Sequence, residues 1–175
     1  MPDTYWDRAA QAYHDFWVPR LIPYYDDLVQ KSVPKPGERV LVTCAGPGGE
    51  LLAVARAMEG TGTLVATDTS REMLALARRC LADADPQMAV TLKQAEANDT
   101  LGARWDLILS AFSLWQLPGR RETLASWRSA LRDEGRVGLL VWGPPDPAGP
   151  FEMVAQALLE MEPALADASK TRELA

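Results

Sequence analysis

Between residues 40 and 142 the sequence alternates short apolar runs with segments of helical periodicity, and this alternation restricts the chain to few folds. The apolar runs are 40–45, 63–67, 88–93, 105–112 and 136–142. Apolar residues at helical spacing follow the first, second, fourth and fifth runs, and Gly135 ends the helix expected after the fourth. Short strands alternating with helices form a parallel sheet covered on both faces. The sequence therefore predicts an α/β fold with a doubly wound sheet of about five strands.

Residues 1–32 have a different pattern. From Trp6 to Trp17, apolar side chains recur at the spacing of one helix face. Pro19 and Pro23 interrupt that spacing, so a second, short helix is predicted at 24–30. The segment 33–37 contains two prolines and a glycine, which is typical of a linker.

A glycine-rich turn follows the first apolar run. Gly46, Gly48 and Gly49 let the backbone approach a ligand, and the helix after them offers unpaired N–H groups. Asp68 ends the second run, where a carboxylate accepts hydrogen bonds from ribose hydroxyls. The turn alone is also compatible with an ordinary tight turn, but the turn and the spaced acid together indicate a nucleoside-type cofactor. Leu51 replaces the third glycine of a dinucleotide fingerprint, which favours a cofactor other than NAD.

Composition argues against several other functional classes. The chain has 18 Lys and Arg against 24 Asp and Glu, a net charge of −6, and no basic cluster that would hold nucleic acid. No apolar run is long enough to span a membrane, and the acidic N-terminal segment does not resemble a signal peptide. Two cysteines make no disulfide framework, so we expect a cytoplasmic protein. The single histidine, His14, leaves little material for a metal site or a hydrolytic triad.

Five segments in order resemble class I S-adenosylmethionine-dependent methyltransferases. They are the glycine-rich motif at 40–49, the strand-two acid and its helix at 67–78, the acid–alanine pair at 95–97, the strand-four motif at 105–110 and the start of strand five at 131–137. The helix at 6–13 resembles the N-terminal cap of the ubiquinone/menaquinone-biosynthesis branch. The resemblance implies a helical cap, residues 1–32, and a Rossmann-like cofactor domain, residues 33–175, in one structural unit. It also implies S-adenosylmethionine as cofactor and S-adenosylhomocysteine as product.

The resemblance further assigns cofactor-binding positions. Gly46 and Gly48 would lie against the methionine part, and Asp68 would bind the ribose. The full predicted set is Tyr13, Cys44, Gly46, Gly48, Asp68, Met73, Glu96, Ala97 and Ser110.

The remaining assignments each have a structural alternative. Met73 would pack on the adenine, but a helix stripe is ordinarily core. Glu96 would take the adenine amino group and the Ala97 amide a ring nitrogen, although an acid in a loop is usually solvated. Ser110 would flank the methionine end, or would simply end a strand. Tyr13 would close the pocket from the cap, or belong to the core.

Three departures from the family pattern stand out. Val42 replaces an acid that would help organise the methionine end, and Cys44 replaces a glycine, with a small buried hydrophobe as its expected role. The segment 164–175 lacks a strand pattern, so the last two strands of the family sheet are expected to be missing. The run at 136–142 would then be an apolar edge strand, and we expect either a homo-oligomer through that edge or a sequence that lacks its end.

The function that we expect is methyl transfer to a small, apolar or aromatic metabolite, with neither nucleic acid nor membrane as a partner. Trp115 and Trp142 either line the acceptor pocket or belong to the core. His14 and Asp146 are the candidates for a base, but no catalytic residue and no metal ligand is assigned. The alternatives are a non-catalytic methyltransferase-like binding or partner protein and, third, a nicotinamide-dependent oxidoreductase.

Overall fold

The computed structural model describes residues 5–84, 86–143 and 150–161. These residues fall into two units, which divide between Val141 and Trp142. The first unit contains the strands and helices α1 to α5, and the second contains helix α6 (Pro150–Met161). Asp146 and the segment 164–175, both discussed above, lie outside the described residues.

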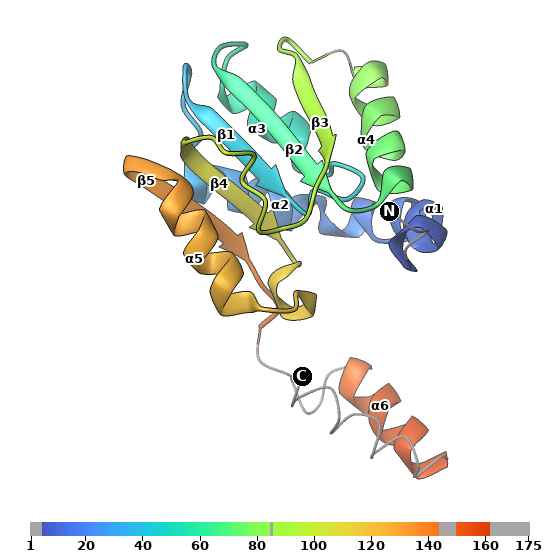
Figure 1. Cartoon of the computed structure of the whole chain (residues 1–175). Helices are drawn as coiled ribbons and strands as arrows, with labels where there is room; N and C mark the ends of the chain where they lie inside the picture. Colours follow the sequence, from blue (N-terminus) through green and yellow to red (C-terminus); the bar gives the residue numbers. More distant parts are fainter. Residues whose placement is uncertain (1–4, 85, 144–149, 162–175) are drawn as a thin grey trace. The chain divides into compact units, whose positions relative to one another are not determined.

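A parallel sheet with the strand order β3-β2-β1-β4-β5 forms the centre of the first unit (Figure 1). Its strands are β1 (Arg39–Thr43), β2 (Thr63–Asp68), β3 (Val90–Gln94), β4 (Trp105–Ala111) and β5 (Leu131–Leu140). The chain runs outward from β1 to β3 and then crosses to β4 on the other side of β1. This order confirms the predicted doubly wound α/β fold, and its switch point lies between β1 and β4.

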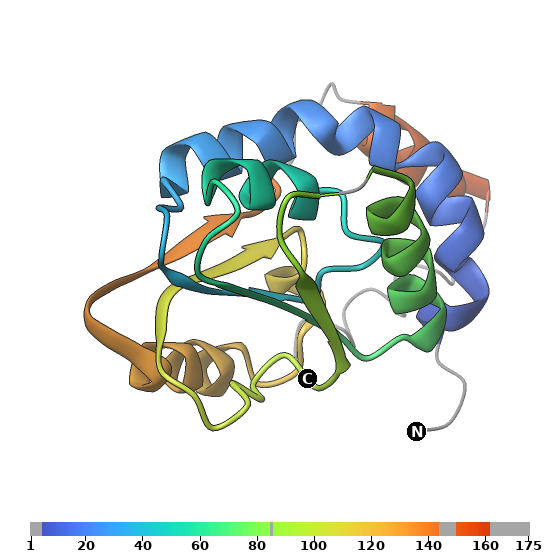
Figure 2. The same cartoon turned by 90° about the horizontal axis from the view of Figure 1, so that it is seen from above.

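Helices cover both faces of this sheet (Figure 2). One face carries α2 (Val18–Ser32), α3 (Leu51–Ala57) and α4 (Arg71–Ala84), and the other carries α5 (Arg120–Ala130). Successive residues of β1 point to opposite faces, so Val40 and Val42 pack in the first layer and Leu41 packs near Trp127 in the second. Burial on both faces explains why the central strands read as continuous apolar runs.

The second helix exists, but it is longer than the predicted 24–30. Helix α1 (Tyr5–Phe16) is followed at once by α2, which begins at Val18 and contains Pro23. Pro19 lies in the first turn, where the missing N–H needs no partner. The side chains of Leu21, Tyr25, Leu28 and Val29 are buried on one stripe. That tertiary packing outweighs the unfavourable proline inside the helix.

The end of α5 also differs from the prediction. The helix ends at Ala130 rather than Gly135, and Leu131 already pairs with Trp105. The register then passes to Leu107 and Arg136, so residues 132–135 bulge from the strand. Among the described residues β5 has β4 as its single neighbour, so it is an edge strand in this sheet.

Hydrogen bonds connect helix α1 to the beginning of α4. The Asp7 carboxylate accepts hydrogen bonds from the Ser70 hydroxyl at 2.7 Å and from the Glu72 backbone N–H at 3.3 Å. The Ser70 hydroxyl in turn accepts the N–H of Met73 at 3.1 Å, so the N-terminal segment and the start of α4 share one network. No helix in the described ranges is both long and apolar enough to cross a membrane.

Candidate functional site

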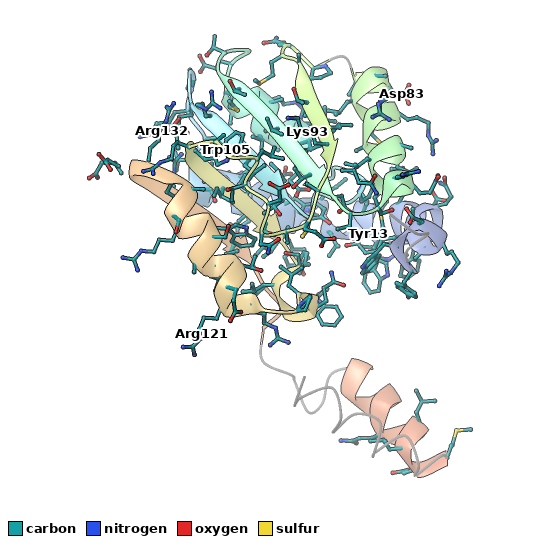
Figure 3. All side chains as sticks on the ribbon, viewed as in Figure 1. Tyr13, Asp83, Lys93, Trp105, Arg121 and Arg132 are labelled. Carbon is teal, nitrogen blue, oxygen red and sulfur yellow. The ribbon has the colours of Figure 1, made fainter. Side chains whose placement is uncertain are left out.

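A cavity of about 220 Å³ lies at the carboxyl ends of the strands. The loops after β1, β2, β3 and β4 line it, and α1 and α2 also contribute side chains to the lining. In Figure 3, Tyr13 lies where α1 meets this end of the sheet, whereas the Arg121 side chain extends outward from the first turn of α5. A doubly wound sheet binds its ligands at this position.

The structure brings most of the predicted site residues to this cavity. The lining includes Tyr13, Cys44, Gly46, Asp68, Met73, Glu96 and Ala97. Gly48 and Ser110 are not in that lining. A Cβ on Gly48 would meet Leu51 at 2.8 Å, and the buried Ser110 hydroxyl donates to the Thr43 carbonyl at 3.0 Å. Both residues shape the loops behind the cavity.

Asp68 joins two of the loops that form the cavity. Its carboxylate accepts the Gly46 N–H at 2.8 Å and the Ser70 N–H at 2.9 Å. Burial raises the pKa of Asp68, and these backbone N–H groups act in the opposite direction. Each carboxylate oxygen has a further acceptor position. The acid can therefore hold the glycine turn in place and still accept hydroxyl groups of a ligand.

Met73 and Tyr13 belong both to the core and to the cavity wall. Met73 is buried in a cluster with Ala10 and Leu76, against which Tyr13 and Trp6 pack. The Tyr13 and Trp6 rings meet edge to face with centroids 5.7 Å apart. The structural and the ligand-binding interpretations of these two residues are thus compatible.

The loop after β3 is held in place by the backbone of Ala97. Its carbonyl accepts the Trp127 indole N–H at 2.6 Å and the Thr43 hydroxyl at 3.3 Å. Ala97 is buried, whereas the neighbouring Glu96 is exposed. This anchoring leaves the Glu96 carboxylate accessible to a polar group in the cavity.

Two non-glycine residues at the cavity have left-handed backbone. Cys44 follows β1 with φ 55°, and Phe112 follows β4 with φ 52°. Such strain is tolerated where the surrounding structure fixes the loop, and it is concentrated at functional sites. Burial raises the pKa of Cys44 to about 11, so its thiol stays protonated near neutral pH. Val42 is fully buried in the apolar layer under α2 and α3.

Sequence reasoning missed several side chains that line the same cavity, among them Glu50 and Tyr25. Glu50 is only 2% exposed, and burial raises its pKa to about 7. Its position directly after the glycine turn is a sequence signal that could have identified it as a site residue. Tyr25 gave no such signal, because it reaches the turn from α2: a Cβ on Gly49 would lie 2.4 Å from the Tyr25 ring.

Other candidates from the sequence lie elsewhere. The Nε2 atom of His14 is 4.0 Å from the Cys80 sulfur, outside the described cavity lining. Trp115 is 54% exposed, and its indole donates to the Phe112 carbonyl at 2.8 Å. Within the described ranges, no group of three or more His, Cys, Asp or Glu side chains has an arrangement that could hold a metal ion.

Comparisons with known proteins agree with this geometry. Residues 40–135 match the family described as a methyltransferase domain. The chain is 25% identical over 145 residues to a demethylmenaquinone methyltransferase of Lactobacillus johnsonii, covering 73% of this chain and 59% of that protein. It is 30% identical over 120 residues to the ubiquinone/menaquinone biosynthesis C-methyltransferase UbiE of Ralstonia pickettii, covering 66% of this chain and 49% of that one.

The fold also has solved counterparts. A SAM-dependent methyltransferase from Aquifex aeolicus superposes with a TM-score of 0.62 at 20% identity, over 81% of this chain and 80% of that one. The chain spans about half the length of the curated relatives that it matches. These findings confirm the family resemblance carried by the sequence motifs.

Proposed function

The chain belongs to the methyltransferase domain family, and from this premise we propose that it transfers a methyl group from S-adenosylmethionine to a small acceptor. The observation that carries the proposal is the Asp68 carboxylate, which is tied to the Gly46 backbone at 2.8 Å and borders the cavity. A fixed acceptor at the end of β2 is suited to the two ribose hydroxyls of a nucleoside.

The residues present fit this cofactor by their chemistry. Met73 offers a polarizable, buried surface for a planar base, and Glu96 offers a carboxylate for an exocyclic amino group. Gly46 has φ 53° and brings bare backbone to the cavity wall. Cys44 and Tyr13 complete the wall on the side of β1 and α1.

When bound, the cofactor supplies an electrophilic methyl group on a sulfonium, which an acceptor atom attacks while the neutral thioether leaves. The task of this chain is then to orient two molecules and to exclude water. Tyr13 and Tyr25 both line the cavity, and burial raises the pKa of both phenols. No general base is required unless the acceptor must lose a proton during attack.

For the acceptor we propose a small apolar or aromatic metabolite. Trp6, Phe112, Leu117 and Pro118 give the cavity wall apolar surface beside the polar groups. The relatives are named for demethylmenaquinone and for ubiquinone/menaquinone biosynthesis, but this chain matches about half of their length. The proposed acceptor class therefore depends on the cavity wall rather than on those names.

A thermal-shift titration tests the cofactor proposal. Ligand at 100 times its Kd stabilises a protein by about 2.7 kcal/mol, which corresponds to about 5–10 °C in a domain of this size. We expect S-adenosylmethionine to raise Tm by this amount and NAD to leave it unchanged. A flat titration with S-adenosylmethionine would contradict the proposal. Binding without formation of S-adenosylhomocysteine across a panel of phenols and quinols would favour a non-catalytic binding protein.

We also propose that two copies pair through β5 in a reducing cytoplasm. Leu139 is 38% exposed on this edge strand, and Val141, which follows the strand, is 52% exposed. Both described cysteines are free thiols. Exposed apolar edges pair readily with other chains. Light scattering after size exclusion should give a dimer for the wild type and a monomer for Leu139→Arg. A monomeric wild type would overturn this proposal.

A further inference from the structure

More carboxylates line the cavity than the hydrogen bonds of the described residues explain. Three carboxylates line it, those of Glu50, Asp68 and Glu96, and none of the described lining residues is Lys, Arg or His. Asp68 is satisfied by two backbone N–H groups, and Glu96 is exposed. The burial of the Glu50 carboxylate is not explained by either of these arrangements.

Glu50 is buried, and none of the described residues gives its carboxylate a cationic partner. It stands at the N-cap of α3, but its side chain makes no capping hydrogen bond to the helix. Within the described residues, burial and the Asp68 charge raise the pKa of its carboxyl, and its own backbone N–H lowers it. Tyr13 and Tyr25 line the same cavity. A buried carboxylate without a positive partner destabilises a fold, so such a group is retained where a ligand supplies the charge.

The proposed cofactor carries two positive centres, and they differ in chemistry. The sulfonium has no N–H, whereas the α-ammonium has three donors that match carboxylate oxygens. Phenol oxygens of Tyr13 and Tyr25 beside Glu50 offer further acceptors for the same ammonium. Val42, fully buried among apolar residues, offers none.

We propose that Glu50 binds the α-ammonium of the cofactor's methionine moiety, with Tyr13 and Tyr25 beside it. This inference rests on the proposed function, since it takes the cofactor to be S-adenosylmethionine. It assigns the ammonium to the loop between β1 and α3. It also makes Glu50 a binding residue rather than a helix cap.

The test compares ligands that differ in the ammonium. S-adenosylhomocysteine carries the ammonium but has a neutral sulfur, and 5′-methylthioadenosine lacks the amino-acid part altogether. We measure the Kd of each, and of S-adenosylmethionine, for the wild type, for Glu50→Gln and for Glu96→Gln as a matched control. Loss of one charge-assisted contact should weaken S-adenosylhomocysteine by about 10- to 100-fold in Glu50→Gln. 5′-Methylthioadenosine should bind that variant as it binds the wild type.

The control should behave differently. Glu96→Gln should weaken both adenosine ligands by a similar factor, because neither lacks the adenine. Unchanged S-adenosylhomocysteine affinity in Glu50→Gln would overturn the inference. So would a loss confined to S-adenosylmethionine, which would point to the sulfonium, or an equal loss for 5′-methylthioadenosine, which would point to a structural role. A wild type that binds none of the three ligands would instead overturn the proposed function itself.

A second measurement needs no variant. The groups that face Glu50 are Tyr13 on α1, Tyr25 on α2 and Asp68 at the end of β2, and the phenols do not titrate near neutral pH because burial raises their pKa. Since Glu50 must be ionised to hold an ammonium, the affinity for S-adenosylhomocysteine should increase about 5- to 10-fold from pH 6 to pH 7.5. Effects of Asp68 cancel in the ratio to 5′-methylthioadenosine. A constant ratio over this range would overturn the inference.

Discussion

The two sides of the cavity are built differently. On the β2–β3 side, Asp68, Glu96 and Ala97 occupy the ends of strands, and hydrogen bonds of the backbone hold them. On the β1–β4 side, Tyr13, Tyr25 and Glu50 come from two helices and a loop, and their side chains make the wall. Strained backbone at Cys44 and Phe112 also belongs to the β1–β4 side.

The difference indicates a division of tasks. The β2–β3 side is a framework that backbone hydrogen bonds hold in place, and it is suited to a nucleoside that is the same for every methyl acceptor. The β1–β4 side keeps a buried acid without a cation and a phenol pair from the N-terminal helices. Such a side is less stable by itself and gains most from a ligand. The following predictions test this contrast, from the largest expected effect to the smallest.

Placing an acid on β1 should unfold the protein rather than restore a ligand contact. Val42 is fully buried in the apolar layer under α2 and α3, so Val42→Asp should lower the free energy of unfolding by about 3 kcal/mol or more. Urea denaturation measures the change. The same substitution at the exposed Val33 should cost no more than about 0.5 kcal/mol. A stable Val42→Asp protein with tighter cofactor binding would contradict the assignment of the ammonium to Glu50.

Replacing Asp68 on the β2–β3 side should abolish most of the cofactor binding. Asp68→Ala removes the two hydrogen bonds that the carboxylate would accept from the ribose hydroxyls, at about 1.5 kcal/mol each. The Kd of S-adenosylhomocysteine should therefore increase about 100-fold. The Kd of 5′-methylthioadenosine should increase by the same factor. Asp106→Ala is the control, because Asp106 accepts the Arg39 N–H at the start of β1, away from the cavity. Equal losses in both variants would mean that the effect is one of folding.

Crowding the glycine turn should disturb the β1–β4 side alone. In Gly49→Ala the new Cβ would lie 2.4 Å from the Tyr25 ring, so the ring must shift at a cost of about 1–3 kcal/mol. Binding of S-adenosylhomocysteine should fall more than binding of 5′-methylthioadenosine. Gly143 has no neighbouring atom within 4 Å of its added Cβ, and Gly143→Ala should be neutral. If both ligands lost affinity equally, the division between the two sides would not hold.

The smallest effect concerns stability against pH. Burial raises the folded-state pKa of Glu50 from the usual 4.5 to about 7, so its contribution to stability is present at low pH and is lost as pH increases to about 7. Glu50→Gln should therefore raise Tm at pH 8 by several degrees and leave it nearly unchanged at pH 4.5. Differential scanning fluorimetry without ligand measures this, with the exposed Glu134→Gln as control. A lower Tm for Glu50→Gln at pH 8 would show that the carboxylate stabilises the fold.

The sequence predicted the β2–β3 side far better than the β1–β4 side, for a physical reason. Asp68 ends β2 and Ala97 lies three residues after β3, so their place in the fold depends on local pattern and on strand order. Tyr25 contacts Gly49 because α2 packs on the sheet, which the local sequence does not indicate. The prolines in α2 also led to a predicted helix that was too short. The beginning of β5 was missed likewise, because the pairing of Leu131 with Trp105 is a long-range contact.

Isothermal titration of the 175-residue protein with S-adenosylmethionine and with S-adenosylhomocysteine, each at two temperatures, is the most direct test of the account. We expect both ligands to bind, one per chain, with a Kd on the order of micromolar, or about −8 kcal/mol. A folded protein that gives no heat with either ligand at either temperature would contradict it.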